Sequence, residues 1–256
     1  MRVRMGDVTV HPRAAMGFGR AADAYERGRP DYPAEAVAWL GDRLELGPGR
    51  TVVDLAAGTG KLTRLLLPTG ARVVAVEPVP AMRETLARAV PEAEVVDGTA
   101  EAMTLPRGSA DAVTVAQAFH WFSTAEALAE IHRVLRPGGR LALVWNRRDL
   151  DGPLEIAVDA MVAGHRGDVP THRSGRWKSA FVASELFGPL EEHLVPHHQE
   201  LDRSGLVDRV MSTSVMAALR GRERRRAVAE LEDLAAGQAE PIRLSYTTQI
   251  YVCVRR

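Results

Sequence analysis

Short apolar runs alternate with amphipathic segments along the first 146 residues. Runs that are rich in β-branched residues and bounded by turn formers predict buried strands, and apolar residues spaced three or four apart predict helices. Strands are therefore expected at residues 51–56, 72–76, 93–96, 110–116 and 140–145. Helices are expected at residues 34–45, 60–67, 80–90 and 124–135. This alternation predicts a parallel α/β sheet with helices on both faces.

The pattern loosens after residue 146. Residues 153–187 carry many charges and are predicted to be mainly helical, and further helices are expected at 205–219 and 221–236. Two more strands are expected at 191–201 and 244–254. No helix follows the last of these, which is typical of an antiparallel closing strand. The sequence thus predicts seven strands, of which the last is antiparallel.

Composition excludes several classes of protein. The 256 residues hold 33 Lys+Arg and 33 Asp+Glu, so the net charge gives no chain-wide basic surface for a nucleic-acid partner. A lone cysteine, Cys253, excludes an intrachain disulfide. No apolar stretch approaches the roughly 20 residues of a membrane helix, and the N-terminus has no apolar signal region. We therefore expect a cytoplasmic protein without a membrane partner.

A glycine-containing loop follows the first predicted strand. The stretch VVDLAAGTGKLT runs from Val52 to Thr63 and includes Asp54, Gly58 and Gly60. In an open α/β sheet, ligands bind at the carboxyl ends of the strands, where glycines let the backbone approach closely. We also expect the N–H groups at the start of the following helix to face that ligand.

Two kinds of nucleotide cofactor use such a loop. A dinucleotide fingerprint needs a third glycine, and this chain has Thr63 at that position, which argues against NAD. The carboxylate of Asp54 beside the loop favours a cofactor that carries positive charge. Glu77 ends the second predicted strand, where a carboxylate can accept hydrogen bonds from both hydroxyls of a ribose. Glu77 fits either cofactor, so it does not decide between them.

Five ordered segments, VVDLAAGTGKLT, VVAVEP, VVDGTAEAMTLP, DAVTVAQAFHWF and LRPGGRLALVW, cover residues 50–146. In this order and spacing the chain resembles the class I S-adenosylmethionine-dependent methyltransferases, and within them the type 11 and trans-aconitate methyltransferase-like branch. The resemblance implies a Rossmann-like fold and S-adenosyl-L-methionine as cofactor. It divides the chain into a cofactor-covering lead-in at 1–32, a cofactor-binding core at 33–147, a small helical cap at 148–190, and the completion of the sheet at 191–256.

The resemblance also implies roles for individual residues. The residues expected to bind the cofactor are Asp54, Ala56, Gly58, Gly60, Glu77, Pro78, Met82, Thr99, Ala100, Glu101, Gln117 and Arg29. Glu77 is expected at the ribose and residues 99–101 at the adenine edge. Tyr25 and Arg29 are expected to close over the cofactor. The chain departs from the family at Ala56, where glycine is frequent, and at Thr99, where an acidic residue is frequent.

The segment after the fourth strand is expected to border the transferred methyl group. His120 is the candidate general base and Trp121 a candidate wall of the acceptor site, with Tyr25 as a further candidate. A histidine hydrogen-bonded to the backbone is an equally good interpretation of His120. His172 lies in the predicted cap, where it is either a solvated surface residue or a residue that contacts the substrate. Methyl transfer needs a base only when the acceptor must lose a proton, and no metal site is predicted.

The predicted function is methyl transfer to a small molecule, at oxygen, nitrogen or carbon, by in-line displacement. A non-catalytic, cofactor-binding regulatory module is the first alternative, and an NAD-dependent oxidoreductase is the second. The sequence leaves the acceptor and the oligomeric state open.

Overall fold

The computed structural model describes residues 3–5, 8–10, 28–167 and 169–256. Its main sheet has seven strands in the order β10-β11-β9-β8-β3-β4-β5. They are β3 (Thr51–Leu55), β4 (Arg72–Val76), β5 (Glu94–Val96), β8 (Ala110–Ala116), β9 (Leu135–Arg148), β10 (Glu191–Leu201) and β11 (Ile242–Val254). Strand β11 is antiparallel to both of its neighbours, and the pairs from β9 to β5 are parallel. The predicted sheet is confirmed, with its antiparallel strand lying between β9 and β10.

Helices accompany the parallel strands as the periodicity predicts. Helix α3 (Ala34–Arg43) precedes β3, and α4 (Thr63–Leu66), α5 (Pro80–Ala89) and α6 (Ala125–Val134) connect successive parallel strands. The prediction of a helix at 60–67 was wrong in length. Gly60 has a left-handed φ of 90°, so the helix begins only at Thr63, and Pro68 limits its other end within the 3-10 turn η1 (Leu67–Thr69). A four-residue helix presents no extended N-terminal dipole, so the expected helix-start contribution to ligand binding is small.

Strand β9 is longer than the predicted strand at 140–145 because it also contains the segment RPGG at 136–139. Its register against β8 shifts between the pairs Ala110–Leu135 and Ala112–Arg140. The extra residues leave the ladder there, and Gly138 adopts a left-handed φ of 72°. Past this irregularity β9 pairs with β11 along its length as far as Arg148. The long strand therefore carries Trp145 and Asn146 well beyond the short parallel strands.

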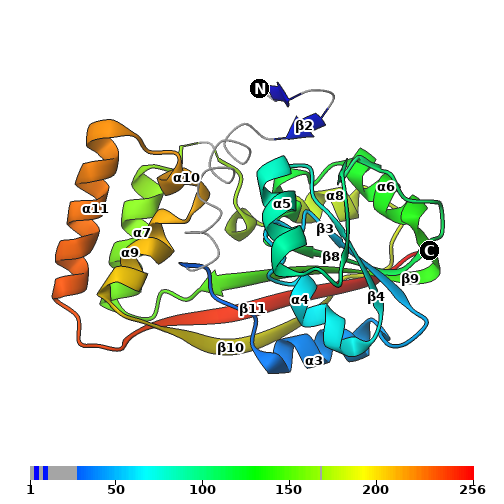
Figure 1. Ribbon diagram of the computed structural model, residues 1–256, viewed down its shortest axis with the longest axis horizontal. Coiled ribbons are helices and arrows are strands. Elements are labelled where there is room, and N and C mark those ends of the chain that lie inside the picture. The colour runs from blue at the N-terminus through cyan, green and yellow to red at the C-terminus, as the bar shows by residue number, and fades with distance from the viewer. Residues whose placement is uncertain (1–2, 6–7, 11–27, 168) are drawn as a thin grey trace.

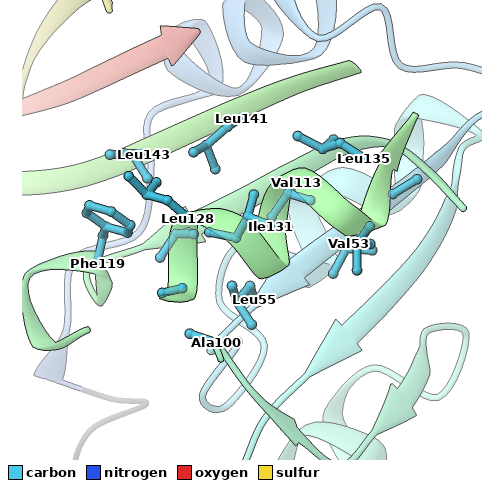
Figure 2. Close-up of a cluster of buried hydrophobic side chains, with 14 of the residues drawn as sticks. Val53, Leu55, Ala100, Val113, Phe119, Leu128, Ile131, Leu135, Leu141 and Leu143 are labelled. Carbon is cyan, nitrogen blue, oxygen red and sulfur yellow. The ribbon is translucent and has the colours of Figure 1, made fainter. Parts of the chain in front are cut away.

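Alternate residues of the parallel strands pack on opposite faces of the sheet. Val53 and Leu55 lie with Leu128 and Ile131 of α6 in one cluster, which Figure 2 shows. Val52 lies in a second cluster with residues of α3 and α4, on the other face. Full burial of one such aliphatic side chain contributes about 1.5–3 kcal/mol. Burial on both faces explains why these strands read as continuous apolar runs.

A third cluster joins helices at one end of the long strands. They are α7 (Pro153–Gly164), α9 (Arg203–Met211), α10 (Ser214–Ala217) and α11 (Gly221–Ala236). Figure 1 shows them together, at the opposite end of β9, β10 and β11 from α6. The helical layer thus includes helices from both sides of residue 190. The division of the chain at 148–190 and 191–256 stays a prediction.

The remaining elements are short. They are the hairpins β1 (Val3–Met5) with β2 (Val8–Val10) and β6 (Gly98–Thr99) with β7 (Ala102–Met103), the 3-10 turns η2 (Phe119–Trp121), η3 (His172–Ser174) and η4 (Arg176–Lys178), and α8 (Ser179–Val182). Among the described helices, none is both long and apolar enough to cross a bilayer. On α11, Arg226 and Glu230 are one helical turn apart and form an ion pair at 2.7 Å.

Candidate functional site

The loop after β3 is built from left-handed residues. Ala56, Gly58 and Gly60 have φ values of 57°, 62° and 90°. A side chain at Gly60 would place its Cβ 2.9 Å from Val90 Cγ2, so glycine is required there by space as well as by conformation. Ala56 adopts an unfavourable conformation for a residue with a Cβ, at a cost of about 1–2 kcal/mol. The sharp turn brings the loop backbone up to the carboxyl end of the sheet.

Asp54 lies beneath this loop and is fully buried. Its two carboxylate oxygens accept hydrogen bonds from Thr63 Oγ1 at 2.7 Å and from Thr114 Oγ1 at 3.0 Å. Burial raises the pKa of Asp54 to about 6, and the two hydroxyls act in the opposite direction. Asp54 is not among the described residues that line the adjacent cavity. Its carboxylate therefore supports the loop from below.

Glu77 directly follows the last residue of β4 and is buried beside the same loop. Its carboxylate accepts hydrogen bonds from the backbone N–H groups of Gly58 and Val79, each at 2.9 Å. Burial raises the pKa of Glu77 to about 7. Each carboxylate oxygen has a further lone pair, so Glu77 is held in place while it keeps the capacity to accept ligand hydroxyls. This fits the carboxylate that a nucleoside ribose requires at this strand end.

A first cavity lies above the glycine loop and encloses about 480 Å³, including its mouth. The described residues that line it are Arg29, Pro30, Tyr32, Ala56, Ala57, Gly58, Thr59, Lys61, Leu62, Ala116, Gln117, Asn146 and Arg209. Gln117 follows β8 with a left-handed φ of 59°, which matches Ala56 on the neighbouring strand. Two such residues on adjacent strand ends are typical of a functional site.

The segment Gly28–Tyr32 closes this cavity. A Cβ on Gly28 would lie 2.8 Å from Asp208 O, so glycine lets the segment pack directly on the backbone of α9. Arg29 Nη2 donates to Ser212 O at 3.2 Å. The side chain of Asn146 donates to the carbonyl of Pro30 at 3.3 Å. These contacts fasten the segment to both the sheet and the helical layer.

The other predicted cofactor residues lie on the β4 side of the loop, and neither they nor Glu77 are among the described residues that line the cavities. Met82 is buried on α5, with its Sδ 3.9 Å from the position of a Cβ on Gly58. Pro78 directly follows Glu77. Residues 99–101 form the tip of the β6–β7 hairpin, where Ala100 packs into the core. Tyr25 lies outside the described residues.

A second cavity adjoins the first and encloses about 770 Å³, including its mouth. Its described lining residues are Arg29, Gln117, His120, Trp121, Trp145, Val162, Arg166, Val169, Pro170, Thr171, His172, Arg173, Thr213, Ser214 and Val215. Arg29 and Gln117 line both cavities, so these two residues mark the junction. The second cavity extends from that junction between the end of β9, the turn η3 and the helices α7 and α10.

His120 in the second cavity is hydrogen-bonded to Trp145. Trp145 Nε1 donates to His120 Nδ1 at 3.3 Å. An indole nitrogen can only donate, so Nδ1 carries no proton and the neutral ring holds its proton on Nε2. Burial lowers the pKa of His120 to about 3, with a further contribution from His172 and Arg29. The only basic nitrogen of His120 is therefore occupied, and the geometry disfavours the general-base role expected from the sequence.

Comparison with known proteins identifies the family of this chain. The family profile described as a methyltransferase domain matches residues 53–143. An uncharacterized methyltransferase of Mycobacterium tuberculosis (strain ATCC 25618 / H37Rv) is 40% identical over 248 residues, which cover 94% of this chain and 95% of the relative. An uncharacterized methyltransferase-like protein of Schizosaccharomyces pombe is 34% identical over 230 residues, which cover 90% and 88% of the two chains. The chain belongs to the methyltransferase family.

A solved structure supports the same assignment. A protein of Anaeromyxobacter dehalogenans assigned as a type II methyltransferase superposes with a TM-score of 0.63 at 28% identity, covering 89% of this chain and 97% of that one. The chain is a class I methyltransferase, and its cofactor is S-adenosylmethionine.

Several residues around the methyltransferase cavities were missed by sequence reasoning. For His172 the solvated-surface interpretation was wrong, because the ring lines the second cavity, stacks on Trp145 with ring centroids 5.0 Å apart, and has its Nε2 2.6 Å from Gln249 Oε1. Arg173 lies beside it on η3. Arg209 is 5% exposed on α9, between the buried residues Leu206 and Val210. A basic residue on the apolar face of a predicted helix is the signal that could have identified Arg209.

Two aromatic residues near the second cavity belong to the core. Phe119 is fully buried. Trp177 begins no helix of its own but lies in the turn η4. It is 2% exposed and packs against Trp145 and Tyr251, with ring centroids 4.8 Å and 5.0 Å away. Trp177 therefore supports Trp145 from behind.

Proposed function

We propose that the protein transfers a methyl group from S-adenosylmethionine to a small molecule, with the cofactor in the first cavity and the acceptor in the second. The observation that carries this proposal is the junction between them, where Arg29 and Gln117 belong to both linings. Two adjoining cavities with a shared boundary allow one molecule to present a methyl group to another. Holding two reactants in line contributes up to about 7–11 kcal/mol in well-oriented reactions.

Residues on the β4 side of the glycine loop, beyond the lining of the first cavity, are assigned to the nucleoside part of the cofactor. Glu77 is assigned to the ribose hydroxyls, and Met82 and Pro78 to the adenine. Residues 99–101 are assigned to the adenine edge. The bound cofactor supplies an activated methyl group whose leaving group is a neutral thioether.

The methionine end of the cofactor is assigned to the junction of the two cavities, beside Arg29 and Gln117. Arg209 is a further cation in the lining of the first cavity. Asp54, Ala56, Gly58 and Gly60 act by shaping and supporting the loop. The segment Gly28–Tyr32 excludes water from this end because it is held by α9 and by Asn146.

The residues of the second cavity act by positioning the acceptor. Trp121 and Trp145 provide apolar walls that exclude water. His120 presents an Nε2–H group, which makes no hydrogen bond to the described residues and can donate to an oxygen or nitrogen of the acceptor. His120 therefore orients the acceptor in this scheme, and an acceptor that must lose a proton needs another route for it.

Calorimetric titration tests the proposal. S-adenosylmethionine and S-adenosylhomocysteine are expected to bind one site per chain, and NAD is expected not to bind. Absence of binding by both sulfur compounds would refute the proposal. Binding of NAD alone would favour an oxidoreductase. A chain that binds the cofactor yet leaves a broad panel of small acceptors unmethylated would favour the regulatory module.

A further inference from the structure

The second cavity combines aromatic walls with positive charge. Three of its described lining residues are arginines, Arg29, Arg166 and Arg173, and none is a carboxylate. One carboxylate lies close behind, because Asp159 Oδ1 is 4.0 Å from Arg166 Nη2 and 3.9 Å from Arg173 Nη2. Asp159 thus lies near both guanidinium groups, at the limit of ion-pair distance, and Asp149 also attracts the Arg173 guanidinium group. Among the described lining residues, positive charge exceeds negative charge.

The three arginines are not placed alike. Arg29 lies at the junction and lines both cavities. Arg166 and Arg173 line only the second cavity, and their side chains are 28% and 32% exposed, so they stand at its open side. The side chain of Arg173 donates to the backbone carbonyl of Arg148, which fixes the guanidinium group at the end of β9.

The walls between these two ends are planar. The rings of His172 and Trp145 are stacked, with an angle of 14° between their planes. The rings of His120 and Trp121 lie 5.0 Å apart. Thr171, Thr213 and Ser214 add hydroxyl groups to the lining. Such a surface favours a flat, conjugated body over a bulky aliphatic one.

We propose that the acceptor is a planar molecule with an anionic group, and that Arg166 and Arg173 bind this group at the mouth of the second cavity. The anion then serves as the recognition element, and the methylated atom lies at the other end, beside Gln117 and His120. Guanidinium groups bind carboxylate and phosphate through charge-assisted hydrogen bonds, so the chemistry admits either anion. The inference rests on the proposed function, since it assigns the second cavity to the acceptor.

Three probes test the proposal on the full-length protein saturated with S-adenosylhomocysteine. Benzoate, phenyl phosphate and the neutral isostere benzamide are titrated by calorimetry, with tryptophan fluorescence as a second readout because Trp121 and Trp145 line the cavity. At least one of the anions is expected to bind about tenfold or more tightly than benzamide. The anion that binds more tightly identifies the group as carboxylate or phosphate.

The variants localise the effect. Arg173→Gln and Arg166→Gln are each expected to abolish most of the preference for the anion, and Arg173→Lys to keep part of it. Arg222→Gln, at an exposed position on α11 that lines neither cavity, is the matched control and is expected to keep all of it. Unchanged binding of S-adenosylhomocysteine by these variants shows that the fold and the first cavity are intact.

Three results would overturn the proposal. They are equal or tighter binding of benzamide, no binding of any probe at millimolar concentration, and an anion preference that survives both glutamine variants. Each leaves the proposed function standing, because S-adenosylhomocysteine remains bound throughout. Failure of the protein to bind S-adenosylhomocysteine is the separate result that refutes the proposed function.

Discussion

Thr63 Oγ1 donates a hydrogen bond of 2.7 Å to the carboxylate of Asp54, and both groups are fully buried. In the sequence, Thr63 counted only as the missing third glycine of a dinucleotide fingerprint. In the structure it is one of two hydroxyls that hold a buried carboxylate beneath the cofactor loop. Thr63, which argues against NAD in the sequence, therefore stabilises the buried Asp54 in this fold.

Removal of that hydroxyl is expected to destabilise the protein. Thr63→Val keeps the shape of the side chain but leaves one oxygen of Asp54 without its hydroxyl donor, which costs about 1–3 kcal/mol for a buried polar group. Urea denaturation at pH 7.0 measures the change. Thr63→Ser keeps the hydroxyl and is expected to lose less. Equal stability of the valine variant and the wild type would show that the hydrogen bond contributes nothing.

Asp54 is also expected to make stability depend on pH. Its pKa rises from 3.8 in the unfolded chain to about 6 in the folded one, so between these values the folded state binds a proton that the unfolded state lacks. Its contribution to stability is therefore present below pH 3.8 and is lost as the pH rises through about 6. The full difference corresponds to about 3 kcal/mol.

Asp54→Asn tests this dependence. The amide can keep both threonine partners, because their hydroxyls rotate to donate or accept. The variant is expected to be more stable than the wild type at pH 8 and to lose the decline between pH 4 and pH 7. Asp111→Asn is the opposite control, since Asp111 has a lowered pKa and its contribution is lost as the pH falls. If Asp54→Asn loses stability between pH 4 and pH 7 as the wild type does, other groups cause the pH dependence.

The sequence predicted the sheet well because its strands are buried on both faces. Val52 and Val53 pack on opposite faces of the sheet. A continuous run of apolar residues is typical of a strand that is buried on both faces. The sequence also predicted the loop, because Gly58 and Gly60 need left-handed backbone. On the acceptor side it pointed to His120 and Trp121, which line the second cavity, but not to the arginines and the tryptophan that complete the lining. His172 and Arg173 reach Trp145 and Arg148 only through tertiary structure, and no local pattern distinguishes them from surface residues.

Cofactor affinity is expected to increase with pH because of Glu77. The ribose hydroxyls donate to an ionised carboxylate, and burial raises the pKa of Glu77 to about 7 in the free protein. Below that pH a proton must leave before the cofactor binds, so the dissociation constant of S-adenosylhomocysteine is expected to be about tenfold higher at pH 6 than at pH 8. Isothermal titration calorimetry at both values measures it.

Glu77→Ala and Glu77→Gln are expected to bind S-adenosylhomocysteine about tenfold to a hundredfold more weakly, with no such pH dependence. Glu94→Gln is the control, because Glu94 is an exposed residue of β5 that pairs with Arg72. Wild-type affinity in Glu77→Ala would remove Glu77 from the cofactor site. A wild-type affinity that is constant from pH 6 to pH 8 would contradict the link to its ionisation.

The hydrogen bond between Trp145 and His120 predicts a fixed tautomer. Because the indole N–H occupies Nδ1, the imidazole is expected to carry its proton on Nε2 and to stay neutral from pH 6 to pH 9, where its pKa of about 3 leaves it uncharged. Nitrogen-15 NMR of the histidine rings distinguishes the two tautomers directly. Trp145→Phe removes the donor and is expected to let the Nδ1–H tautomer appear. Protonation of His120 near pH 6.5 in the wild type would restore it as a candidate base.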